Sequence, residues 1–263
     1  MYILDKKDYI SLNTITENLL SSSGIAHSAA SYIMKNEALT VKGLAKIKTV
    51  TSTLSSMIRS IMLINDFIEN DKINEPSEKN FYCNIDKFFD AFIAELNSTF
   101  ASGAEIKFIY ISKLSENRTF FVNMAKLEKI LYSLIYCLIK NLKDCHKKEI
   151  KIAIKETHTK ENGYIITITS TGKALRTGLT AIFDAKNTSE IDFCDIDTLN
   201  LLSACKTVET LKANVVYSAT KTLNKFVLTI PHITSFDVEK QLEVKEYIPD
   251  TNIISAYFGD LII

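Results

Sequence analysis

Glycine is scarce in this sequence: only seven of its 263 residues are glycine, while proline occurs three times and tryptophan not at all. Because glycine has no side chain, it lets the backbone come very close to a bound phosphate group. The sequence therefore offers few places where a glycine-rich loop could wrap around a phosphate.

An excess of either charge is also absent, since Lys and Arg total 31 and Asp and Glu also total 31. Proteins that bind nucleic acid usually carry a basic excess that neutralises phosphates, so no nucleic-acid partner is expected. The cysteines are odd in number, scattered and without a CxxC pair, which indicates neither a disulfide framework nor a metal site. They are Cys83, Cys137, Cys145, Cys194 and Cys205.

Long hydrophobic runs are missing too. No segment approaches the run of about 18 apolar residues that spans a bilayer. The first residues, MYILDKKDYISLN, carry charges where a signal peptide needs an apolar stretch. We therefore expect a cytoplasmic protein that does not enter the membrane, and any membrane-bound sensor would be a separate partner.

Two long helical patterns occupy residues 1–73. The first runs from about Ser11 to Lys35, and the second places apolar residues at steps of three and four from Val41 to Ile68. Two helices with such wide apolar faces cannot cover each other completely. This favours an antiparallel helical hairpin that pairs with a second copy into a four-helix bundle, and hence a homodimer. A monomeric helical domain is the alternative.

The pattern changes after residues 74–80, a polar segment with a proline that is expected to be a linker. Between residues 81 and 231, helical periods are interspersed with short strands, several of them linked as hairpins. This mixture predicts an α+β sandwich with helices over one face of a sheet. Residues 232–263 look extended and partly strand-forming, and their role as a C-terminal extension is open.

Three local patterns carry a resemblance to a known family. They are Ser23–Ala30, which contains His27, then Asn123–Lys140, and then Asp197–Val215 followed by Phe226–Pro231. In this order they resemble the sensor histidine kinase core, in which a dimerising, phospho-accepting hairpin precedes an ATP-binding domain of the GHKL type. The resemblance implies such a hairpin in residues 1–73 and such a domain in residues 81–231.

The resemblance also locates the magnesium-binding positions of that family, and they are altered here. The Asn that supplies an oxygen to Mg²⁺ in the family corresponds to Cys137, and the Asn position before it corresponds to Ser133. Magnesium prefers oxygen ligands, so a thiol is a poor replacement. We expect Cys137 to be a small buried residue instead.

The family's adenine and phosphate motifs are altered as well. The Asp that binds adenine corresponds to Ser170, and of the glycines that follow it Gly172 is retained and the second is Ala174. The phosphate-binding glycine motif corresponds to the segment that includes Thr198 and Asn200, which has no glycine. These changes predict a degenerate domain that binds neither ATP nor another cofactor.

His27 is the remaining candidate for chemistry. An imidazole is largely neutral near pH 7 and is nucleophilic, so it can accept a phosphoryl group from an aspartyl phosphate. Ile25 and Ile33 are expected to face the bundle and to leave His27 outward. The acidic residue that follows the family's acceptor histidine is Ser28 here. An ordinary surface histidine is therefore the alternative.

Together these observations favour a histidine phosphotransferase that exchanges phosphate between His27 and the Asp of response-regulator receiver domains. The receiver would supply the Mg²⁺, so this chain would need no cofactor of its own. One alternative is a non-catalytic pseudokinase that regulates a histidine kinase or response regulator by binding it. Another is an active kinase with a divergent nucleotide pocket.

Overall fold

The computed structural model divides the chain into two units, which are described separately. A helical unit contains residues 1–73 and 252–263, and an α+β unit contains residues 74–251. The structure describes residues 20, 23–34, 40–71, 81–101, 105–114, 119–122, 124–142, 147–157, 163–183, 196–231, 246–249 and 251–262. The linker predicted at 74–80 lies outside these residues.

The helical unit contains a helical segment at residues 23–34, a long helix α2 (Val41–Asp71) and a C-terminal helix α7 (Thr251–Ile262). Thr40 caps α2, because its Oγ1 accepts a hydrogen bond from the backbone N–H of Gly43 at 3.1 Å. None of the described helices is both long and apolar enough to cross a membrane. The expected antiparallel pairing of the first two helices stays a prediction.

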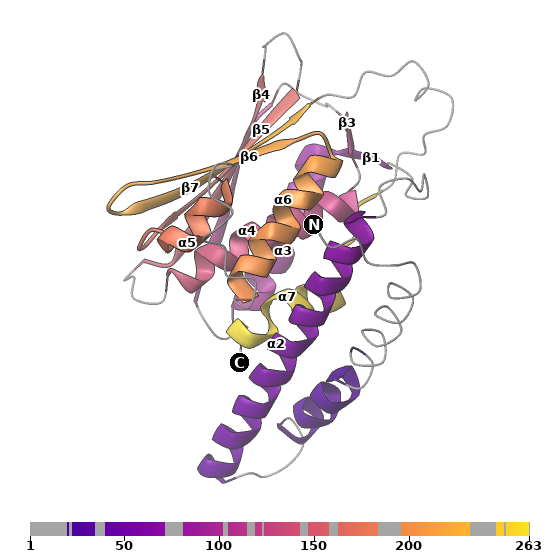
Figure 1. Cartoon of the computed structure of the whole chain (residues 1–263), viewed down its shortest axis with the longest axis vertical. Helices are drawn as coiled ribbons and strands as arrows, with labels where there is room; N and C mark the ends of the chain where they lie inside the picture. Colours follow the sequence, from indigo (N-terminus) through magenta and orange to yellow (C-terminus); the bar gives the residue numbers. More distant parts are fainter. Residues whose placement is uncertain are drawn as a thin grey trace. The chain divides into compact units, whose positions relative to one another are not determined.

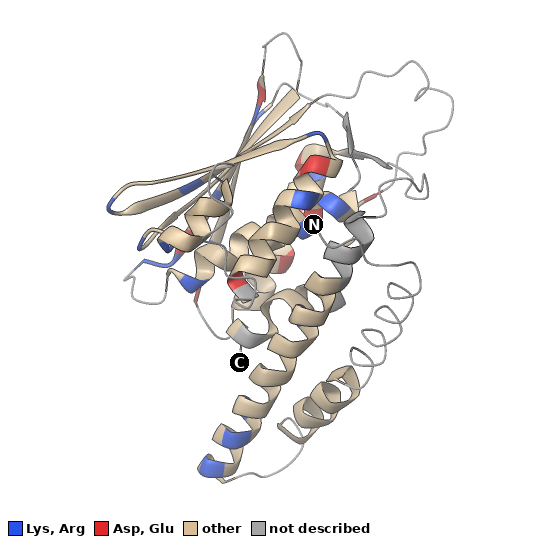
Figure 2. Ribbon diagram, viewed as in Figure 1, with Lys and Arg blue, Asp and Glu red and all other residues tan. Residues whose placement is uncertain are grey.

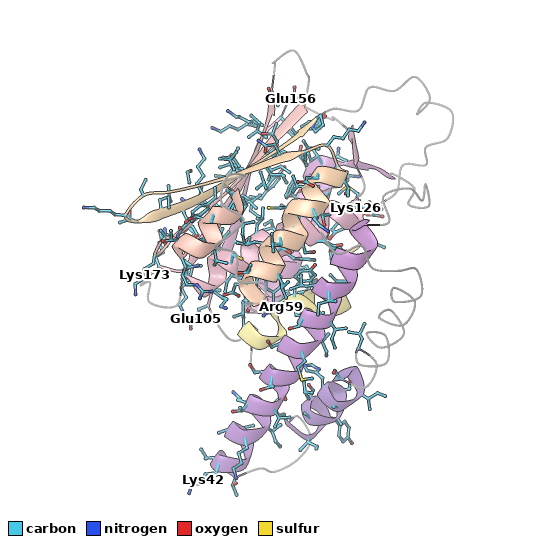
Figure 3. The ribbon with its side chains drawn as sticks, in the orientation of Figure 1. Lys42, Arg59, Glu105, Lys126, Glu156 and Lys173 are labelled. Carbon is cyan, nitrogen blue, oxygen red and sulfur yellow. The ribbon has the colours of Figure 1, made fainter. Side chains whose placement is uncertain are left out.

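Helix α7 corrects the expectation that residues 232–263 are extended. Its buried side chains, Ile254, Tyr257 and Phe258, recur at steps of three and four, and so they lie on one face of a helix. This face packs against α2 (Figure 1). The guanidinium of Arg59 on α2, which is 1 % exposed, donates from Nη1 to the backbone oxygen of Tyr257 at 3.3 Å (Figure 3).

Close packing between α7 and α2 depends on Gly259. A Cβ added at this position would lie 2.7 Å from Oγ of Ser55 and 3.1 Å from its Cβ. Both distances are shorter than ordinary van der Waals contact, so a glycine fits here and a larger residue would push the helices apart. The C-terminal helix is therefore an integral, packed part of the helical unit.

The α+β unit is organised around a mixed five-stranded sheet in the order β2-β4-β5-β7-β6. β2 and β4 are parallel, and the other neighbouring strands are antiparallel. The strands are β2 (Lys107–Lys113), β4 (Glu149–Thr157), β5 (Gly163–Thr171), β6 (Asn214–Ala219) and β7 (Leu223–Pro231). A separate antiparallel pair joins β1 (Phe81–Asn84) to β3 (Thr119–Val122).

Helices cover one face of this sheet (Figure 1). They are α3 (Ile85–Phe100), α4 (Met124–Lys140) and α6 (Ile196–Thr210), together with the short α5 (Thr177–Thr180) and the 3-10 helix η1 (Ala181–Phe183). Asn84 caps α3 by accepting from the N–H of Lys87 at 3.0 Å. The core lies between helices and sheet, where Ile152 of β4 and Ile166 of β5 are both 0 % exposed. The predicted α+β architecture with helices over a sheet is confirmed.

The segment before α7 is anchored in the α+β unit. Tyr247 donates its hydroxyl proton to the carboxylate of Glu128 on α4, and its ring lies 4.3 Å from that of Phe88 between centroids. Tyr132 donates to the same carboxylate at 2.8 Å. The chain is thus anchored by Tyr247 and then, from residue 252, rejoins the helical unit.

Candidate functional site

His27 lies in the helical segment at residues 23–34 and is half-buried. Burial lowers the pKa of its imidazole below the usual 6.5, because desolvation penalises the charged form. The neutral form, which is the nucleophilic one, is therefore favoured at pH 7.

Ile25 and Ile33, which are expected to face the bundle, are 70 % and 39 % exposed in the single chain. A second copy would contribute to that bundle, so their orientation toward it stays a prediction. Ser28, which takes the place of the acidic residue that follows the acceptor histidine in the family, is exposed to solvent.

Three of the predicted nucleotide-site positions meet where α6 packs on α4. The side-chain amide of Asn200 donates from Nδ2 to the backbone oxygen of Ser133 at 2.9 Å and lies 3.5 Å from Sγ of Cys137. All three residues are buried, with exposures of 0 %, 1 % and 2 % for Asn200, Ser133 and Cys137. Asn200 therefore fills the space between the two helices with a polar contact.

This contact is a poor environment for a magnesium ion. The amide nitrogen of Asn200 is directed at Ser133 and Cys137, and no described residue hydrogen-bonds to its Oδ1. A thiol is a weak ligand for a hard cation, and a single carboxamide oxygen cannot replace a set of oxygen ligands. Among the described residues, no cluster of three or more His, Cys, Asp or Glu side chains could hold a metal ion.

An ion-pair cluster at the amino terminus of α6 was missed by the sequence analysis. Asp197, in the first turn of α6, accepts from Nζ of Lys140 at 2.7 and 2.6 Å, and Nη2 of Arg176 lies 3.5 Å away. The amino end of a helix is a favourable position for an anion. Here a carboxylate of the chain itself takes that position. Lys140 is 57 residues from Asp197, so only the fold reveals the pair.

The remaining predicted positions lie at the end of β5 and in the loop that follows. Ser170 is 2 % exposed, and its Oγ has no hydrogen-bond partner among the described residues. Gly172 has a φ of 125°, a backbone conformation that a residue with a side chain rarely adopts, so a turn explains its retention. Ala174 is exposed.

Two side chains from the neighbouring strands fix this loop. The hydroxyl of Tyr217 on β6 accepts from the N–H of Leu175 at 2.9 Å and donates to Oδ1 of Asn224 at 2.6 Å. Asn224 on β7 in turn donates to the backbone oxygen of Lys173 at 2.9 Å. The loop after β5 is therefore held by the chain's own hydrogen bonds.

The predicted site residues thus fall into separate groups. Ser133, Cys137 and Asn200 are in contact with one another. Thr198 is buried on α6, two residues before Asn200. Ser170 lies in β5, and Gly172 and Ala174 lie in the loop that follows it. His27 belongs to the helical unit, whereas the other positions belong to the α+β unit.

Comparisons with known proteins give the same fold. The structure is similar to that of the Acinetobacter baumannii histidine kinase AdeS, with a TM-score of 0.51, 12 % identity, and coverage of 81 % of this chain and 96 % of that one. It is also similar to full-length ShkA in complex with AMPPNP, with a TM-score of 0.57, 14 % identity, and coverage of 86 % of this chain and 46 % of that one. The chain therefore spans less than half the length of ShkA. No family model matches the sequence, and no curated protein sequence matches it. At these identities the similarity shows a histidine-kinase-type fold.

Proposed function

We propose that this chain is a histidine phosphotransferase of a two-component phosphorelay, which passes phosphate between His27 and the Asp of a response-regulator receiver domain. The observation that carries the proposal is the buried contact of Asn200 with Ser133 and Cys137. It fills positions that resemble a nucleotide site with the chain's own side chains. In a chain with a histidine-kinase-type fold that does not use nucleotide, His27 would be the remaining candidate for a reactive group.

The proposed step moves a phosphoryl group from an aspartyl phosphate of the receiver to the imidazole of His27. The neutral imidazole nitrogen of His27 attacks phosphorus, the bond between phosphorus and the Asp oxygen breaks, and the carboxylate leaves with its electron pair. The lowered pKa of His27 keeps that nitrogen unprotonated and available at pH 7. Mg²⁺ bound by the receiver would neutralise charge on the moving phosphoryl group, so this chain needs no metal ligands. The same step in reverse returns the phosphate.

A homodimer is part of this proposal. On α2 the apolar positions alternate between steps of three and four, which is the pattern of a coiled-coil seam. These seam residues are Ile47, Val50, Leu54, Met57, Ile61 and Ile64. Every second one is open in the single chain, with exposures of 51 % for Val50, 45 % for Met57 and 37 % for Ile64. A second copy would cover this row and remove it from water.

A regulator that acts by binding alone is the second candidate. It is favoured by Ser28, because the acidic neighbour that would orient the imidazole or accept its proton is absent. In that case the surface of the first helix would matter and His27 itself would be replaceable.

The test is transfer of radiolabelled phosphate from a panel of phosphorylated receiver domains to the purified chain. We expect acid-labile, base-stable label that disappears in His27→Ala and persists in the matched variant His146→Ala. Label that persists in His27→Ala would contradict the assignment of His27. Binding of a receiver or kinase without any label would replace the phosphotransferase with the regulator.

A further inference from the structure

The sheet has a second face, opposite the helices, and one row of residues crosses it over all five strands. The strand registers place Ile111, Ala153, Thr167, Val227 and Val216 side by side in that order. Their neighbours along the strands, such as Ile152 and Phe226, are buried against the helices. Since side chains alternate between faces, the row points away from the core. No member of the row is buried, and Ile111 and Val216 are 40 % and 50 % exposed.

Lysines flank this row on the same face. Lys113 of β2 lies beside Lys155 of β4 in the strand register, and Lys225 of β7 is two residues from Val227. Strand alternation places all three on the same face as the row. Figure 2 shows lysine positions, in blue, along the strands. The full set of lysines on this face of the described strands is Lys107, Lys113, Lys151, Lys155 and Lys225.

Negative charge does not balance these lysines. Among the described strands of the sheet, only Glu149 and Glu156 are acidic, and both belong to β4. By strand alternation, Glu156 lies on the helix-covered side, near the end of the strand. Glu149 is on the open face but is already bound by Lys147 at 2.8 Å and Lys151 at 3.0 Å. On the described strands this face therefore carries more positive than negative charge, although the whole chain is neutral.

We propose that this sheet face is a docking surface for an acidic protein partner with an aliphatic centre. Lys107, Lys113, Lys155 and Lys225, which form no ion pair with the described residues, fit carboxylates at the rim. The row of aliphatic side chains and Thr167 fits an apolar centre. The described open face has no arginine and no aromatic side chain, so it lacks the groups that stack on nucleic-acid bases or anchor in a membrane interface. The surface belongs to the α+β unit, whereas His27 belongs to the helical unit, and the proposal goes beyond the proposed phosphotransfer.

The test uses a random 15-residue peptide library displayed on phage and selected on the immobilised full chain. The matched proteins are Lys113→Glu/Lys155→Glu/Lys225→Glu on the sheet and Lys42→Glu/Lys46→Glu/Lys48→Glu on the exposed start of α2. We expect peptides rich in Asp, Glu and aliphatic residues whose affinity falls about 30-fold for the sheet variant and stays unchanged for the α2 variant. Circular dichroism and thermal melting of both variants establish that they are folded.

A milder pair of variants tests the apolar row. Ile111→Ser and Val216→Ser keep every lysine, and each should weaken the selected peptides about threefold if the row is the centre of the site. Selection of peptides without acidic enrichment, or equal binding to the sheet variant, would overturn the proposal. It would also be overturned if duplex DNA or phosphatidylserine vesicles bound through these lysines while no selected peptide did.

Discussion

The side-chain amide of Asn200 on α6 donates a hydrogen bond to the backbone oxygen of Ser133 on α4, at 2.9 Å, in a place that no solvent reaches. The two residues are 67 positions apart in the sequence. A buried polar group of this kind stabilises a structure only while it keeps its partner, because leaving the partner unsatisfied incurs its desolvation penalty. The contact therefore serves the packing of α6 on α4.

Replacing Asn200 by Ala should accordingly destabilise the α+β unit. The substitution removes the donor to Ser133 and leaves a small cavity beside Cys137, for a combined loss of about 1–3 kcal/mol in the free energy of unfolding. Urea denaturation followed by circular dichroism measures the loss. Asn214→Ala, at an exposed position on β6, is the control and should stay within about 0.5 kcal/mol of the parent. Equal effects of the two substitutions would show that the Asn200 contact contributes nothing.

A titration with a fluorescent ATP analogue should show no saturable binding up to about 1 mM, with or without Mg²⁺. The reason is that Asn200 occupies the space between Ser133 and Cys137, and Asp197 takes the amino end of α6. A kinase with intact nucleotide motifs, run in parallel, shows that the assay detects binding. Saturable, Mg²⁺-dependent binding to this chain would instead support an active kinase with a divergent pocket.

Much of the fold could be predicted from the sequence, and the gaps have physical causes. The apolar periods of α2 and α4 are long enough to show a helix without tertiary information. Helix α7 is short, and its adjacent apolar pairs, such as Tyr257 and Phe258, fit a strand equally well, so packing against α2 decides its structure. Through the resemblance the sequence predicts a role for each site position, and these roles stay predictions. The bridge made by Asn200 and the ion pair between Lys140 and Asp197 could not be predicted, because both join distant segments.

The contact between α7 and α2 makes Gly259 intolerant of a side chain. Gly259→Ala should lower the free energy of unfolding by about 1–2 kcal/mol, since its methyl group would meet Oγ of Ser55 at 2.7 Å. Adding Ser55→Ala removes the nearer atom and should recover part of the loss. The control is Gly24→Ala, where a Cβ meets nothing within 4 Å and a helix gains from alanine. Thermal melting of the full chain measures all three, and a Gly259→Ala that gains as much stability as Gly24→Ala would show that the two helices are not closely packed.

The seam of α2 predicts self-association. Met57→Glu places a charge in the middle of an apolar row that a second copy would bury, so it should convert a dimer into a monomer. Light scattering coupled to size-exclusion chromatography gives the mass directly. Lys48→Glu changes the charge at an exposed position next to the seam and should leave the dimer intact. A parent protein that is monomeric at high micromolar concentration would remove the homodimer from the proposed function.

The lowered pKa of His27 predicts how stability depends on pH. The folded state holds this imidazole below its unfolded pKa of 6.5, so the unfolded chain binds more protons in the window between the two values. Stability from this group is therefore complete above pH 6.5 and is lost as pH falls through the window. The difference in unfolding free energy between the parent and His27→Gln should shrink in the same direction. Proton NMR titration of the imidazole gives the folded pKa itself, and a value at or above 6.5 would show that the ring is solvated like a surface histidine.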